Sequence, residues 1–138
     1  MGLCLADSIL LNNYVFNPVH MRYLFTLWLE HGLNNGCRPR SIGLGGNISI
    51  SMNEFMHQQT PYTFRGERFN NGNGSLMRLA PVPVAYADNP EKGVLYSGLQ
   101  SETTHNGFEA AECCKLMGLI IISLINRAPE ADGKALIL

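Results

Sequence analysis

Apolar residues recur along the chain at the three- and four-residue spacings of amphipathic helices. The pattern predicts a short helix over residues 2–11. A longer helix is expected to begin with Asn17 as its N-cap and Pro18 in its first turn, and to end at Gly32. The residues expected to face the core from these two helices are Leu3, Ala6, Ile9, Leu10, Met21, Leu24, Phe25, Trp28 and Leu29.

The remaining pattern is also helical, and alternation typical of strands is absent. A third helix is predicted over residues 47–57, and a fourth is entered through Ser75 and interrupted by two prolines. A fifth is expected over residues 90–100, capped by Asn89 and Pro90, and the longest over residues 108–126. The third helix would bury Ile48, Met52, Phe55 and Met56. The sequence therefore predicts an all-α orthogonal bundle of about six helices.

Two long loops, residues 33–46 and 58–74, separate these helices and are rich in glycine. Loops of that length are unusual in a compact bundle unless they carry a function. Apolar residues make up 46% of the chain and charged residues only 15%, where about 25% is usual. We therefore expect some helix faces to be left apolar, so that self-association or contact with more protein is plausible.

Charge and hydropathy exclude two classes of partner. The net charge of −1 provides no basic field for nucleic acid. The apolar run at residues 116–125 is too short to span a membrane, which takes about 20 residues, and is expected to be a buried helix.

The cysteines predict no metal centre. Cys4, Cys37, Cys113 and Cys114 lack the spacing of zinc ligands, and the adjacent pair is expected to lie in the core. The sequence begins without a signal peptide, so a reducing, cytoplasmic location is expected.

The most informative stretch is the turn Gly72-Asn73-Gly74-Ser75, which opens onto an apolar run. Its glycines permit positive φ angles, Asn73 tolerates one, and Ser75 could cap the following helix. Successive N–H groups in such a turn form a concave anion site. The alternative is an ordinary glycine-rich loop that enters a helix. Arg78 follows one turn later and faces either the same pocket or solvent.

His105 closes the element Thr103-Thr104-His105 at a break between helices. The imidazole either contacts a ligand in a cleft or satisfies neighbouring backbone groups. The carboxylates are scattered, without Asp-Asp, Asp-x-Asp or His/Asp metal spacing. No catalytic residue and no metal ligand is therefore assigned, which argues against an autonomous metal hydrolase.

Three motifs occur in order: Met1–Ser8, Asn71–Arg78 and Thr103–His105. Together they resemble the central portion of the ADP-ribosylglycohydrolase family, which also includes certain crystallins. The resemblance implies an all-α protein that binds two magnesium or manganese ions and hydrolyses the glycosidic bond between ADP-ribose and a protein side chain. ADP-ribose or an ADP-ribosylated protein would be the partner.

The resemblance also implies roles for single residues. Gly72, Asn73, Gly74 and Ser75 would line the phosphate and distal-ribose region, and His105 would contact the ligand nearby. The family's two metal-binding motifs would lie before the first residue and after the last, so residues 1–138 are expected to form a partial domain without metal ligands. Two hypotheses follow: a segment of a hydrolase, or an inactive ADP-ribose-binding or crystallin-like structural remnant.

Overall fold

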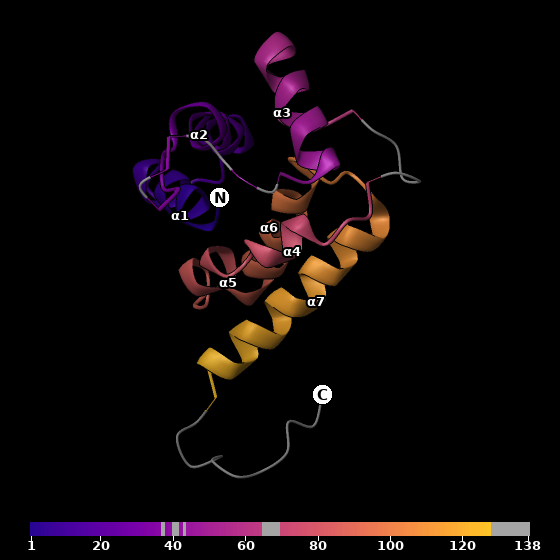
Figure 1. Ribbon diagram of the computed structural model, residues 1–138. Coiled ribbons are helices and arrows are strands. Elements are labelled where there is room, and N and C mark those ends of the chain that lie inside the picture. The colour runs from indigo at the N-terminus through magenta and orange to yellow at the C-terminus, as the bar shows by residue number, and fades with distance from the viewer. Residues whose placement is uncertain (37, 40–41, 43, 65–69, 128–138) are drawn as a thin grey trace.

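The computed structural model describes residues 1–36, 38–39, 42, 44–64 and 70–127, and these residues form helices and no strand (Figure 1). The all-α prediction is confirmed. The helices of the described part are α1 (Gly2–Leu11), α2 (Pro18–His31), α3 (Gly46–Gln58), α4 (Gly74–Met77), α5 (Pro81–Ala85), α6 (Pro90–Glu102) and α7 (Phe108–Ile125).

The helices fall into two groups joined by short elements. The pair α1 and α2 packs together, and α6 packs along the long helix α7. Between the two pairs lie α4 and α5: α5 contacts α1, α6 and α7, while α4 contacts α6 and α7 (Figure 1). Helix α3 contacts α2 and extends away from α7. The short helix α4 is thus held where the two groups meet.

The helix ends follow the predicted capping chemistry. The Asn17 side-chain oxygen accepts a 3.0 Å hydrogen bond from the His20 N–H at the start of α2. The Asn89 side chain accepts one of 3.2 Å from the Lys92 N–H at the start of α6. Gly32 ends α2 in the left-handed conformation, with φ of 70°. Both helices begin with proline, as predicted.

The predicted fourth helix is two short helices, which raises the number in the described part from six to seven. Helix α4 ends at Met77, and α5 begins at Pro81. A continuous helix would place the Pro81 ring against the carbonyl of Met77, four residues earlier, and proline has no N–H to donate. The chain therefore leaves the helix at Arg78, which turns that side chain toward the interior.

The core is formed largely by the predicted residues. Ile9, Met21, Leu24, Phe25, Met52 and Phe55 are all buried. Helix α1 presents a different face from the predicted one, because Leu3 and Leu10 are exposed while Cys4 and Leu5 are fully buried. Met56 is also exposed. A helix as apolar as α1 has no polar face to fix its orientation, so periodicity alone could not choose the buried side.

Helix α7 is less buried than predicted. Gly118 and Ile122 pack inward, but Leu116, Leu119 and Leu124 are exposed. The two adjacent cysteines also differ: Cys114 is buried, whereas Cys113 is exposed, which corrects the expectation of a core pair.

Helix α7 packs closely against α6 at Gly118. A Cβ at residue 118 would lie 2.3 Å from the Ser97 hydroxyl oxygen, so α6 and α7 approach closely there.

No described helix combines the length and the apolar character of a membrane span. Cys37 lies outside the described residues.

Candidate functional site

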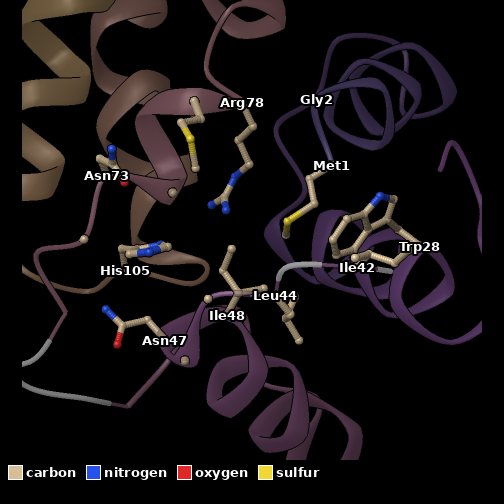
Figure 2. Close-up of a pocket in the computed structure, with 15 residues that line it drawn as sticks. Met1, Gly2, Trp28, Ile42, Leu44, Asn47, Ile48, Asn73, Arg78 and His105 are labelled. Atoms are coloured by element: carbon tan, nitrogen blue, oxygen red, sulfur yellow. The ribbon is translucent and has the colours of Figure 1, made fainter. Parts of the chain in front are cut away.

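A cavity of about 590 Å³ opens where α1, the start of α3, the glycine turn and the segment between α6 and α7 meet (Figure 2). Ligand sites for small molecules commonly have this size. One wall carries the glycine turn, Arg78 and His105, while the opposite side is largely apolar. The lining residues are Met1, Gly2, Trp28, Ile42, Leu44, Gly45, Gly46, Asn47, Ile48, Gly72, Asn73, Gly74, Met77, Arg78 and His105.

The glycine turn lies directly against His105. A Cβ at residue 72 would be 3.3 Å from the imidazole Nε2, and one at residue 74 would be 2.9 Å from Cε1. Neither glycine has a positive φ; in the described residues the glycines that do are Gly32 and Gly36. Closeness to the imidazole therefore leaves no room for a side chain at residue 74 and only a tight fit at residue 72. The positive φ angles that these residues permit are not adopted.

The backbone N–H groups of the turn remain available. Gly72, Asn73 and Gly74 donate no hydrogen bond to any described residue. Gly72 and Asn73 are exposed, and Gly74 is half-buried beside the cavity. Backbone N–H groups without protein partners can donate to an anionic ligand.

His105 is held rigidly at the wall of the cavity. Its side chain is 3% exposed, and Nδ1 shares a 2.8 Å hydrogen bond with the Thr104 hydroxyl. Its backbone N–H donates 2.7 Å to the Ser101 carbonyl. Burial, and then the nearby Arg78 cation, lower the pKa of His105 to about 4. The imidazole is therefore neutral at neutral pH and directs its Nε2 edge toward the glycine turn.

Ser75 has a different environment from the other predicted site residues. It is buried and does not line the cavity. Its hydroxyl bonds to the Ser101 hydroxyl at 2.8 Å, and its carbonyl accepts 3.1 Å from the Gln100 amide. Asn73 is the N-cap of α4 and no side chain caps that helix, so the predicted capping by Ser75 was wrong. Ser75 therefore links the turn to α6 by hydrogen bonds.

Arg78, whose direction the sequence left open, lies beside the cavity and is 4% exposed. Figure 2 shows its guanidinium directed into the space between His105 and Met1. Nε donates 3.0 Å to the Gln100 side-chain oxygen, and Nη2 donates 2.8 Å to the Gln100 carbonyl and 3.2 Å to the Thr103 hydroxyl. Nη1 is buried and has no hydrogen-bond partner in the part of the chain that the structure describes.

The environment of Arg78 contains no neutralising carboxylate in the described residues. The guanidinium carbon lies 4.8 Å from the centre of the Phe25 ring, and each of its hydrogen-bond acceptors is neutral. Burial lowers the pKa of Arg78 to about 9, so the side chain remains a cation at neutral pH. An unpaired N–H of a buried cation is costly, by more than about 1–3 kcal/mol.

The apolar side of the cavity was not predicted as part of a site. Trp28 was expected in the core, yet it is half-buried and lines the cavity together with Ile42, Leu44 and Ile48. Asn47 adds a polar group near His105 (Figure 2). The one signal in the sequence that could have pointed to Trp28 is that it is the single tryptophan.

The described residues do not fit a divalent metal site. Nowhere among them do three His, Cys, Asp or Glu side chains come together. None of the described residues that line the cavity is a carboxylate. Magnesium and manganese prefer carboxylate oxygens, so these residues do not supply such a site.

Comparison with known proteins decides the family. Residues 1–137 match the sequence profile of the family described as ADP-ribosylglycohydrolase. The chain belongs to the ADP-ribosylglycohydrolase family. The predicted resemblance, carried by the three motifs, is thereby confirmed.

The chain is also similar to a protein named ADP-ribosylarginine hydrolase Tri1, of Pseudomonas putida (strain GB-1). It is 26% identical over 135 residues, which is 98% of this chain and 36% of the relative. The chain thus spans about a third of the length of the curated relative that it matches.

Proposed function

We propose that the cavity binds ADP-ribose and that this chain provides the ADP-ribose-binding part of a hydrolase that removes ADP-ribose from protein side chains. The family membership and the printed activity of the relative, an ADP-ribosylarginine hydrolase, support the reaction class. The substrate would be an ADP-ribosylated protein. In this proposal Gly72, Asn73 and Gly74 contact the diphosphate, and His105 contacts the ligand beside them.

One observation carries this proposal: the glycine turn, whose three N–H groups have no acceptor among the described residues, lies against His105 at the wall of a cavity without carboxylates in its described lining. A diphosphate needs hydrogen-bond donors and an environment that does not repel negative charge. The turn supplies the donors and Arg78 supplies a cation nearby. The apolar wall with Trp28 offers a surface for the remainder of the nucleotide.

The chemical contribution of these residues is binding and orientation. Neutral His105 can donate or accept one hydrogen bond at Nε2, while Thr104 fixes its ring through Nδ1. Glycoside hydrolysis also requires a group that activates water, usually a carboxylate or a metal-bound water. The described residues of the cavity supply neither, so we expect the isolated chain to bind ADP-ribose without hydrolysing its protein linkage.

The second candidate is a protein that binds ADP-ribose, or serves structurally, without catalysis. The absence of carboxylates from the described cavity lining favours it. Both candidates share the binding step and differ in whether water-activating groups act together with this cavity.

Calorimetry with ADP-ribose, with and without magnesium, tests the binding step. We expect saturable binding without magnesium, at one ligand per chain. Turnover of an ADP-ribosyl-arginine protein by the purified 138-residue chain would contradict the expected lack of catalysis. A folded chain that binds no ADP-ribose under either condition would overturn the proposal and leave a structural role.

A further inference from the structure

We propose that Arg78 is the residue that anchors a phosphate of the bound ligand, through the guanidinium nitrogen Nη1, and so allows the cavity to hold a diphosphate without a divalent cation. This inference rests on the proposed function, because it assigns the charged contact within the same cavity. Arg78 is a positioning residue in this role, since it fixes the ligand and takes no part in bond cleavage.

The hydrogen bonds of Arg78 leave one direction open. Gln100 and Thr103 accept hydrogen bonds from Nε and Nη2, and these bonds fix the plane of the guanidinium against α6. The Phe25 ring stacks against the same group. Among the three guanidinium nitrogens, Nη1 alone lacks a partner in the described residues, although the side chain is 96% buried and borders the cavity. A fixed guanidinium with one unpaired N–H is preorganised for an oxygen of an anion.

Arg22 shows how a buried arginine with a purely structural role differs. Its Nη1 donates to the Thr60 carbonyl at 2.9 Å and its Nη2 to the Ser51 carbonyl, so both terminal nitrogens are used within the protein. Its Nε is buried without a partner among the described residues, whereas in Arg78 the unpaired nitrogen is the terminal Nη1. The carboxylate of Glu54 also contributes a favourable charge interaction to Arg22. Arg22 does not border the cavity. Arg78 has no such carboxylate among the described residues, so its charge remains available to an anion.

Nη1 is closed to solvent in the present conformation. A phosphate oxygen therefore reaches it only when the cavity wall shifts slightly. The pairing would satisfy a buried N–H that has no partner among the described residues, which makes such a shift favourable. We expect ligands that contain phosphate to cause this shift of the cavity wall, and ligands without phosphate to leave the wall unchanged.

Side-chain ¹⁵N NMR of the arginines in the intact chain tests the proposal directly, in buffer with a chelator. We expect both ADP-ribose and inorganic pyrophosphate to shift the Arg78 guanidinium signals and slow their rotation, while Arg22 signals stay unchanged. Adenosine, which has no phosphate, is expected to leave Arg78 unchanged. If ADP-ribose perturbs Trp28 fluorescence and the Gly74 amide but not Arg78, this inference fails and the proposed function stands. If ADP-ribose perturbs nothing, both fail.

Matched variants provide the second measurement. Arg78→Lys keeps the charge but loses the fixed fork, and we expect it to weaken ADP-ribose binding by about ten- to a hundredfold. Arg22→Lys alters an equally buried arginine away from the cavity and is expected to change affinity by less than about twofold. Equal affinities of Arg78→Lys and the unaltered chain, with circular dichroism showing both folded, would overturn the anchor. Should Arg78→Lys not fold, the NMR experiment on the unaltered chain decides.

Discussion

Gly74 and His105 are in such close contact that residue 74 has no space for a side chain. A Cβ there would lie 2.9 Å from the imidazole Cε1 and 3.3 Å from the Cδ1 of Ile48. The imidazole cannot move aside easily, because it is almost fully buried and tied to Thr104. The glycine turn and His105 therefore form one rigid wall of the cavity.

This contact predicts the effect of Gly74→Val. The branched side chain would push the turn away from His105, and we expect calorimetry to detect no binding of ADP-ribose. Overpacking of this kind costs about 1–3 kcal/mol of unfolding free energy. Helix content, measured by circular dichroism, should remain nearly unchanged.

Gly46→Ala provides the matched control for that substitution. Residue 46 also lines the cavity, but a Cβ there meets nothing within 4 Å. We expect this variant to bind ADP-ribose normally. Unchanged affinity in Gly74→Val would remove the turn from the ligand site.

The lowered pKa of His105 predicts a pH-dependent stability. Because the imidazole has a pKa of about 4 when folded and about 6.5 when unfolded, the unfolded chain binds more protons between these pH values. The contribution of His105 to the free energy of unfolding is then fully present above pH 6.5 and is lost as the pH falls toward 4. This residue accounts for up to about 3 kcal/mol of that loss.

Urea unfolding of the chain and of His105→Gln between pH 4 and pH 7 measures this contribution. The carboxylates titrate equally in both proteins, so their effects cancel in the difference. We expect the unaltered chain to lose more stability on acidification than the variant. Parallel pH profiles would show that His105 is not held neutral by its surroundings.

A second glycine anchors the turn from the other side. A Cβ at residue 107 would lie 2.0 Å from the Asn71 side-chain oxygen, which accepts a 3.3 Å hydrogen bond from the Ala110 N–H at the start of α7. Gly107→Ala should displace Asn71 and lower the unfolding free energy by about 1–3 kcal/mol. Denaturant unfolding checks this, with Gly45→Ala as the control, since residue 45 has open space. Equal stability of the two variants would contradict the close packing.

Removal of the Arg22 side chain tests the link between α2 and α3. Its guanidinium joins the Ser51 carbonyl in α3 to Thr60 beyond the end of that helix. Arg22→Ala leaves these acceptors unpaired and opens a cavity, so we expect about 3 kcal/mol of lost stability. Urea unfolding measures the loss. A change below about 1 kcal/mol would mean that water replaces the guanidinium at little cost.

The sequence predicted the helices well where capping chemistry marks their ends. Asn17 with Pro18, and Asn89 with Pro90, fix the starts of α2 and α6 through contacts within a few residues. Which face of α1 is buried depends on contacts with α2 and α5, and local periodicity does not carry that information. The break at Arg78 follows from Pro81, but the sequence pattern alone did not show that the chain would form two helices there.

The sequence also predicted some features of the candidate site and missed others. The motif order brought Gly72, Gly74 and His105 together correctly, because both segments belong to one recognisable family pattern. The reason for glycine was misjudged, since closeness to a residue distant in sequence cannot be derived from local conformation. The inward direction of Arg78 and the position of Trp28 depend on long-range packing, so the sequence left the first open and placed the second in the core.

A crystal structure of the chain with ADP-ribose, obtained without added metal, would show whether the glycine turn binds the diphosphate. We expect the diphosphate within hydrogen-bond distance of the N–H groups of residues 72–74, with His105 in contact with the ligand. ADP-ribose bound elsewhere on the chain, or a cavity that stays empty at saturating ligand, would contradict this expectation.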